Sequence, residues 1–323
     1  MMSLSMSDFL LSFGQILGAK LRIVFIGFKS FQKLPSLLSL LTLLFLLPLN
    51  ACAHRLEIHD LKNNEELEFT AISSLGPQKG YIVLGENHYN PAIQRTQAEL
   101  IRSIVLAKGA KGRFSVGWEF LDYPTQEQVN TWTDQWKKGE MDSAAFMKKL
   151  FPSANSAINH QSYLPILEVI KDLQGELIAV NAPREWKRII IKNGLGGLSA
   201  DQVNGEIRTG SEGYFERFKQ VMQDHVKEGE LARYFEAQYY TDSIMANALK
   251  NQSNHDLRFL VVGSFHADYM DGVVRELQHL SPAEEVLTLK LEDGRKLSNE
   301  EMKALKNPHE KFGSIADILI FIR

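Results

Sequence analysis

The alternation of apolar and polar residues predicts strands and helices in turn along most of the chain. Four short apolar runs bounded by turn-forming residues have the pattern of buried strands. These runs are residues 81–85, 113–120, 176–181 and 258–263. Each is followed by a segment typical of a helix, beginning at Pro91, near Pro124, at Pro183 and at about Asp271. Asn90 can cap the first helix, which we expect to run to about residue 106, and Pro91 suits its first turn.

A longer segment between the third and fourth predicted strands has helical periodicity. A glycine-rich loop at 194–197 leads into two predicted helices, 211–226 and 228–249, and two more strands are expected at 285–291 and 316–322. Strands joined by helices run parallel, so the pattern predicts an α/β fold with a largely parallel sheet covered by helices on both faces and a helical insertion. Ligands of such sheets bind beyond the carboxyl ends of the strands.

The first fifty residues have a different pattern. Residues 34–51 are nearly all leucine and small residues, and basic residues lie upstream, which is the layout of an export signal. The run ends in Leu49-Asn50-Ala51-Cys52, which resembles the lipobox of bacterial lipoproteins, where cleavage precedes an acylated cysteine carrying, for example, palmitate. We expect a signal peptide over 1–51, a tether over 52–64 anchored at Cys52, and a folded domain over 65–323. The alternative is an uncleaved anchor, since about 18 apolar residues can span a bilayer.

Cysteine content and charge narrow the classes of function. Cys52 is the only cysteine, so the chain forms no intrachain disulfide and has no other thiol for catalysis or metal binding. Cleavage before it would remove four basic residues and one acidic residue, which lowers the net charge from −3 to about −6. Nucleic acid is therefore not expected as a partner.

Polar residues follow the predicted strands at what should be one edge of the sheet. The first strand ends in Gly85-Glu86-Asn87-His88, the fourth in Gly263-Ser264-Phe265-His266, and the third in Asn181-Ala182-Pro183-Arg184. Histidine and carboxylate together suit a divalent metal or general acid–base chemistry. A single Gly-x-x-His segment is more often a glycine beside a helix-capping histidine, but two at equivalent strand ends favour a site.

Two further groups of residues belong to the same prediction. Glu119 lies inside the apolar run 116–121, where burial requires a cation, a histidine or a hydrogen-bond donor as its partner, and a structural pair with Arg184 is the competing interpretation. Gln238, Asp242 and Met245 are spaced to share one face of a helix. That helix either closes over the sheet edge or carries a solvated stripe.

These motifs, taken together and in order, resemble the ChaN-like haem-binding uptake lipoproteins, of a superfamily that includes Tiki and TraB proteins and, more remotely, erythromycin esterases. The resemblance covers about residues 75–280. It rests on Leu84-Gly85-Glu86-Asn87-His88-Tyr89-Asn90-Pro91, Gln97, Glu119-Phe120, Pro165-Ile166-Leu167, Asn181-Ala182-Pro183-Arg184-Glu185, Gln238, Asp242, Met245-Ala246 and Gly263-Ser264-Phe265-His266. It implies a haem-binding lipoprotein that serves iron acquisition at the cell envelope.

The resemblance also implies functions for individual residues. Haem contacts are expected from His88, His266, Tyr89, Gln238, Asp242 and Arg184. Tiki proteins are similar at Glu86, His88, Glu119 and His266 and use these positions for metal-dependent proteolysis. Many relatives have histidine after Asn-Pro, where this chain has Ala92-Ile93-Gln94, so an iron ligand from that stretch is in doubt. Histidine or tyrosine can hold haem iron, and the tyrosines near the sheet edge are Tyr89, Tyr123, Tyr163 and Tyr269.

Three hypotheses follow for the function. The first is a haem-binding lipoprotein whose partners are haem, a membrane reached through the lipid anchor, a haem transport system and, optionally, a second copy of the chain. The second is a metal-dependent hydrolase, in which His88 and His266 bind a divalent metal and Glu86 or Glu119 is the general base. The third is a scaffold without a ligand. A haem site needs a wide apolar slot, for which the aromatic helix over 234–240 can supply a wall.

The residue after the predicted anchor bears on localisation. The residue after Cys52 is Ala53 and not an aspartate. This resembles the sequence of lipoproteins that are sorted to the outer membrane in Gram-negative bacteria. The expected location is therefore the cell envelope, at the outer membrane.

Overall fold

The fold is taken from a computed structural model that describes residues 55–153 and 159–323. The predicted signal peptide and Cys52 lie outside the described residues, so their assignment stays a prediction. Within the described part of the chain, no helix has both the length and the apolar character needed to cross a membrane.

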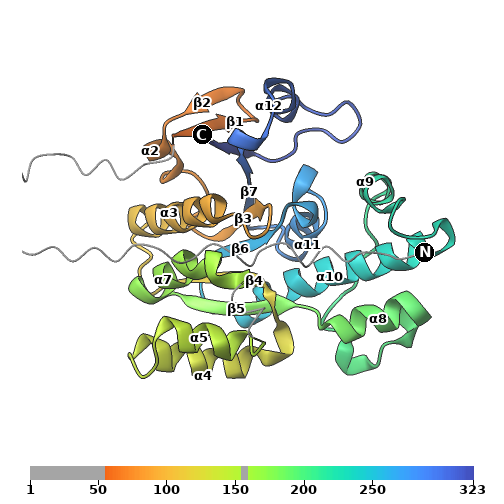
Figure 1. The fold of residues 1–323 in the computed structure, drawn as a ribbon, viewed down its shortest axis with the longest axis horizontal. Helices are drawn as coiled ribbons and strands as arrows, with labels where there is room; N and C mark the ends of the chain where they lie inside the picture. The colour runs from red at the N-terminus through yellow and green to blue at the C-terminus, as the bar shows by residue number, and fades with distance from the viewer. Residues whose placement is uncertain (1–54, 154–158) are drawn as a thin grey trace, which may run out of the picture. The chain divides into compact units, whose positions relative to one another are not determined.

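Eight strands form one sheet in the order β2-β1-β8-β7-β3-β6-β4-β5 (Figure 1). The strands are β1 Leu56–Asp60, β2 Glu65–Leu67, β3 Gly80–Glu86, β4 Phe114–Asp122, β5 Glu176–Asn181, β6 Leu257–Gly263, β7 Glu285–Asp293 and β8 Ile318–Ile322. From β8 to β5 every neighbouring pair is parallel, and only β1 pairs antiparallel, with β8 and with β2. The predicted α/β fold with a largely parallel sheet is confirmed.

Helices pack on both faces of this sheet. The α-helices of the described residues are α2 Phe69–Ile72, α3 Pro91–Ala107, α4 Gln126–Lys137, α5 Ser143–Leu150, α7 Leu164–Asp172, α8 Arg184–Asn193, α9 Glu212–Met222, α10 Leu231–Gln252, α11 Val273–Leu280 and α12 Asn299–Lys306. Successive strand residues point to opposite faces. In β3, Ile82 and Leu84 belong to one hydrophobic cluster, and Tyr81 and Val83 to another. Both faces are therefore buried, as the continuous apolar runs indicate.

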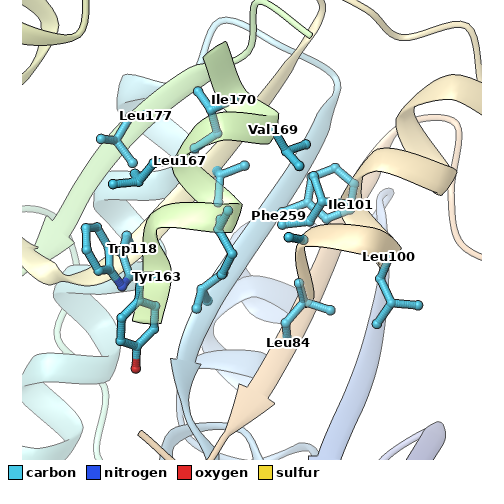
Figure 2. Close-up of a cluster of buried hydrophobic side chains, with 14 of the residues drawn as sticks. Leu84, Leu100, Ile101, Trp118, Tyr163, Leu167, Val169, Ile170, Leu177 and Phe259 are labelled. Atoms are coloured by element: carbon cyan, nitrogen blue, oxygen red, sulfur yellow. The ribbon is translucent and has the colours of Figure 1, made fainter. Parts of the chain in front are cut away.

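The larger cluster lies between the sheet and helices α3, α4, α5 and α7. Figure 2 shows part of it, where Leu167 and Ile170 of α7 and Ile101 of α3 meet Trp118 and Phe259 of the strands. The hydroxyl end of Tyr163, just before α7, points out of this cluster (Figure 2). On the opposite face, α10 and α11 cover β5 and β6.

The helix starts follow the capping signals of the sequence. The Asn90 side chain accepts a hydrogen bond from the backbone N–H of Ala92, and Pro91 occupies the first turn of α3. Pro183 precedes α8 as predicted. Near Pro124 the chain first forms a short 3₁₀ turn at Tyr123–Thr125, so α4 begins only at Gln126.

The expected tether differs from the structure. Leu56–Asp60, which fall inside the predicted tether, form β1 and pair with β8 along their whole length. Within β1, Ile58 and Asp60 are buried. The strand was not predicted because its few apolar residues alternate with charged ones and form no continuous apolar run. The described residues that fall inside the predicted tether accordingly belong to the same compact unit as the residues that follow them.

Candidate functional site

The carboxyl ends of β3, β6 and β4 bring two histidines and a glutamate together. β6 lies between β3 and β4 in the sheet. Glu119 of β4 places Oε1 3.5 Å from Nε2 of His266 and Oε2 3.8 Å from Nε2 of His88. The same carboxylate accepts a hydrogen bond of 2.5 Å from the backbone N–H of Gly263. The prediction that Glu119 meets histidines or donors is confirmed, whereas the predicted pair with Arg184 is wrong, because the exposed Arg184 forms no ion pair among the described residues.

His88 is held by a carboxylate two residues before it. Its Nδ1 lies 2.9 Å from Oε1 of Glu86, which is 2% exposed. Glu86 also accepts hydrogen bonds from the Tyr163 hydroxyl and, at 2.8 Å, from the Gln94 amide. Gln94 comes from the stretch where many relatives are expected to carry histidine, and here it fixes Glu86. Burial alone would lower the pKa of His88, but the hydrogen bond with Glu86 and the charge of Glu119 raise it above its usual value.

His266 is held by a carboxylate from a different part of the chain. Its Nδ1 lies 2.6 Å from Oδ1 of Asp242, a fully buried residue of α10. The Tyr214 hydroxyl donates to Asp242 at 2.9 Å, and the Gln238 amide donates to the Tyr214 oxygen at 2.9 Å. Burial opposes a charge on His266, yet Asp242 and Glu119 raise its pKa. The face of α10 with Gln238 and Asp242 thus closes over the sheet edge and is no solvated stripe, while Met245 packs in the core.

Gly263 lets the two histidine segments approach each other. A Cβ atom at this position would lie 2.7 Å from Nε2 of His88 and 3.4 Å from Oε2 of Glu119. Its φ of −57° suits any residue, so the requirement is one of space. The glycine at the end of β6 is therefore needed for the approach of His88 to Glu119.

Tyr89 presents an aromatic side chain at the rim. It has a positive φ of 58° and is 46% exposed. Its ring stacks on Phe120, with centroids 5.5 Å apart and planes at 29°, and contacts the rings of His88 and Tyr163. Burial, with the charges of Glu119 and Glu86, raises the pKa of Tyr89.

A cavity of about 220 Å³ opens beside the histidine cluster. Glu119, Gln238 and His266 line one side, and Lys187 of α8 lies near them. Ile191, Phe218, Met222 and Tyr234 supply apolar surface from α8, α9 and α10. Of the predicted aromatic wall over 234–240, Tyr234 reaches this cavity, whereas Tyr240 is buried in the core. Sequence reasoning missed Lys187, because nothing in the pattern of α8 separates it from the other basic residues there.

A larger cavity, of about 530 Å³, lies on the β7 side of the rim, where Asn87 and Glu292 help to line it. Tyr269, His309 and residues of α12 line it. Nδ1 of His309 accepts hydrogen bonds from the backbone N–H groups of Lys311 and Phe312, at 3.1 and 3.3 Å. Nδ1 of His309 is thus occupied by contacts within its own loop. Volume alone does not make this cavity the better haem site.

The remaining predicted residues are placed as follows. Tyr163 is 1% exposed and donates to Glu86, so it is a partner of Glu86 and does not reach a ligand at the rim. Tyr123 is half-buried against Trp186. Among residues 55–153 and 159–323, no group of three or more histidine, cysteine, aspartate or glutamate side chains is arranged to hold a metal ion. The predicted metal site at Glu86, His88, Glu119 and His266 gains no support from this arrangement.

Comparisons with known proteins agree with the fold and identify a family. The family model described as haem-binding uptake, Tiki superfamily, ChaN matches residues 76–277. A solved structure described as cofacial haem binding to ChaN of Campylobacter jejuni is similar, with a TM-score of 0.62 and 16% identity over 83% of this chain and 97% of that one.

Two further solved structures are more distant. A succinoglycan biosynthesis protein has a TM-score of 0.40 and 11% identity over 79% of this chain and 89% of that one. The type III effector HopBA1 has a TM-score of 0.37 and 11% identity over 76% and 88%. The comparison with curated proteins gives no match.

Proposed function

The chain belongs to the haem-binding uptake family of the Tiki superfamily, the ChaN family, and from this premise we propose that it binds haem at the carboxyl rim of its sheet. The proposed role is haem and iron acquisition at the cell envelope. The observation that carries the proposal is the family match over residues 76–277, which contains the rim residues Glu86, His88, Glu119, Gln238, Asp242 and His266. Haem is the cargo in this role, and the residues of the chain bind and orient it.

The chemistry of the rim fits haem. Ferric haem iron accepts histidine or tyrosine as an axial ligand. In both rim histidines, His88 and His266, Nδ1 is within hydrogen-bond distance of a carboxylate and Nε2 faces the carboxylate of Glu119. The phenol of Tyr89 is the exposed group of the set, and its ring, stacked on Phe120, offers apolar surface to a porphyrin. We therefore assign Tyr89 as the axial ligand.

Protonation gives this assignment a further consequence. The raised pKa of Tyr89 means that its hydroxyl keeps its proton at neutral pH until iron displaces it. Haem binding should then release a proton, and affinity should increase as the pH rises toward the pKa of the phenol. A histidine ligand would instead gain affinity only up to the pKa of its imidazole.

The test is a haemin titration of the purified chain, followed by visible absorbance, with Tyr89→Phe and Tyr269→Phe compared. We expect a saturable Soret shift at stoichiometric haemin in the wild type and in Tyr269→Phe. In Tyr89→Phe the affinity should drop about 100-fold and the charge-transfer band of a phenolate ligand should be lost. A Tyr269→Phe protein that loses the shift, with Tyr89→Phe unaffected, would move the site to the larger cavity.

Anchoring is a separate part of the proposal. The lipobox-like sequence before Cys52 and the Ala53 that follows support attachment to the outer membrane through an acylated cysteine. Fractionation of cells that express the wild type and Cys52→Ser measures it. The wild type should sediment with the envelope, and Cys52→Ser should lose its lipid, seen as a mass difference. An identical mass for the two proteins, apart from the substituted atom, contradicts the anchor.

A further inference from the structure

The cavity of about 530 Å³ on the β7 side of the rim is not explained by the proposed haem function. Most of its lining belongs to residues 292–315, which follow the segment 76–277 that matches the family model. Its volume lies within the range of about 300–1,000 Å³ that is typical of pockets for small organic molecules. The cavity is therefore a second candidate site, and its lining indicates what it would bind.

Much of the lining is apolar surface that α12 and its neighbours present. The apolar side chains that line the cavity are Leu297, Ala304, Leu305, Pro308 and Ile315. Leu297 and Leu305 pack against the hydrophobic cluster of α12 and β8, yet both stay only partly buried. A ligand with an apolar body would cover this remaining surface, which is favourable because it removes apolar atoms from water.

The charged side chains of the lining are two carboxylates, Glu292 and Glu301. Glu292 is 8% exposed, whereas Glu301 lies at the surface. Among the residues that the structure describes, no lysine or arginine lines this cavity. Arg295 and Lys306, which are close in sequence, form their ion pairs with other carboxylates. The potential inside the cavity is therefore negative and favours a cation.

The buried lysine next to Glu292 does not balance this negative charge. Nζ of Lys290 lies 3.1 Å from Oε1 of Glu292, but it also donates to both oxygens of Asp268, at 2.9 and 3.0 Å. One ammonium group is thus shared by two carboxylates. Oε2 of Glu292 accepts a hydrogen bond of 2.7 Å from Nδ2 of Asn87. Because a carboxylate has about four acceptor positions, Glu292 can still accept from a ligand.

The second carboxylate is ionised at neutral pH. Oε2 of Glu301 accepts a hydrogen bond of 2.7 Å from the backbone N–H of Ser298, and the hydrogen bonds with Ser298 lower the pKa of Glu301. Oε1 takes no part in that backbone bond and is the oxygen that a ligand would meet. Negative charge beside apolar surface suits a ligand that has both a cationic group and an apolar body.

We infer that this cavity binds an organic cation, an amine attached to an apolar body, with Glu292 as the main partner of the ammonium group and Glu301 as the second. The inference does not rest on the proposed haem function. The same carboxylates disfavour haem here, because the propionates of haem are anions. Asn87, which donates to Glu292, lies between Glu86 and His88 in the chain, so the two sites would be neighbours.

The experiment uses three probes that share one apolar body and differ in charge: 4-phenylbutylamine, 4-phenylbutanol and 4-phenylbutanoate. Each is titrated by calorimetry into the wild type, Glu292→Gln, Glu301→Gln and Ala304→Phe. Glutamine keeps the shape of glutamate and removes its charge, and phenylalanine at the exposed position of Ala304 reduces the volume of the cavity. Glu300→Gln is the matched control, since Glu300 is an exposed residue in the first turn of α12 outside the lining.

We expect the wild type and Glu300→Gln to bind the amine about tenfold more tightly than the alcohol, and the carboxylate probe most weakly. In Glu292→Gln the preference for the amine should fall to about twofold with the affinity for the alcohol unchanged, and in Glu301→Gln to about fivefold. Ala304→Phe should weaken the amine and the alcohol alike, by about tenfold. Circular dichroism and thermal unfolding establish that each variant is folded. If Glu292→Gln does not fold, the variants at the exposed positions Glu301 and Ala304 decide the question.

Three results would overturn the inference. The wild type binds the amine no more tightly than the alcohol, or both glutamine variants keep the full preference for the amine. The third is displacement of the amine by saturating haemin, which would place haem in this cavity. A wild type that binds the amine but not haemin supports the inference and contradicts the haem function, because the amine titration contains no haem.

Discussion

The two Gly-x-x-His segments at the rim are alike in sequence, but their histidines are held in different ways. His88 takes its carboxylate from Glu86, two residues earlier, whereas His266 takes its carboxylate from Asp242 of α10, 24 residues earlier. The His88 side chain is 33% exposed and the His266 side chain 13%. The first imidazole is thus positioned mostly by local structure, and the second depends on the closure of α10 over the sheet.

This difference indicates how the rim is divided. The side with His88 opens to solvent beside the exposed Tyr89, and the side with His266 is enclosed by Gln238, Tyr214 and Asp242. A ligand bound at Tyr89 would approach from the open side, whereas on the enclosed side His266 lines the 220 Å³ cavity. The carboxylate of Glu119 joins the two sides.

The largest difference in stability between the two sides is expected when the carboxylate that holds each histidine is removed. Asp242→Ala should lower the free energy of unfolding by about 3 kcal/mol, because it leaves a buried imidazole and the Tyr214 hydroxyl without their partner. Glu86→Ala should cost about 2 kcal/mol, because water can reach His88, whose side chain is 33% exposed. Urea unfolding measures both.

Glu230→Ala is the control, since this exposed residue before α10 makes no side-chain cap hydrogen bond and should change stability by no more than about 0.5 kcal/mol. Equal losses in Asp242→Ala and Glu86→Ala would remove the distinction between an enclosed and an open side.

The two glycines give a second, smaller test. Gly263→Ala places a methyl group against Nε2 of His88 and should cost about 1.5 kcal/mol while moving this ring away from Glu119. Gly85→Ala meets its nearest atom, Cβ of Ala267, at 3.5 Å and should cost less than about 0.5 kcal/mol. Unfolding curves give the energies, and the imidazole resonances of His88 report the displacement. Unchanged resonances in Gly263→Ala would mean that the added methyl group does not displace the His88 ring.

The smallest expected effect is the pH dependence of stability at the open side. The pKa of His88 is raised in the folded state, so its contribution to stability is complete below its ordinary pKa near 6.5 and is lost as the pH rises through the raised value. The difference in unfolding free energy between the wild type and His88→Gln should therefore shrink by less than about 1 kcal/mol between pH 6 and pH 9, since solvent screens a group that is a third exposed. A difference that grows over this range contradicts the assigned direction.

The sequence was sufficient for most of the fold. The strands β3 to β6 correspond to apolar runs bounded by turn residues, and the capping residues Asn90 and Pro183 predicted where α3 and α8 begin. Strand β1 was not predicted, because its five residues include charged side chains and its partner β8 lies at the other end of the chain. Pairing between chain ends leaves no local signal.

The candidate site also contains some residues that the sequence predicted and others that it did not. His88 and His266 follow strands β3 and β6, and Glu119 lies near the end of β4. These three strands are neighbours in the sheet, so the rule for parallel sheets was enough to bring the residues together. Tyr163, whose hydroxyl binds Glu86, is separated from it by 77 residues, and its hydrogen bond could not be read from spacing. Lys187 also depends on tertiary structure, because only the packing of α8 against α10 places it in the cavity.

The antiparallel strand β1 bears on how the molecule would respond to mechanical load. Leu56 pairs with Ile322, so the first residue of β1 meets the last residue of β8, and the backbone N–H of Arg323 donates to the carbonyl of Arg55. Tension on the chain ahead of Arg55 would open the β1–β8 pairs one after another from that end. β8 and β7 stand between β1 and β3 in the sheet. A pull from the amino-terminal side would thus be absorbed by a strand that carries no rim residue, and the rim would keep its shape under force.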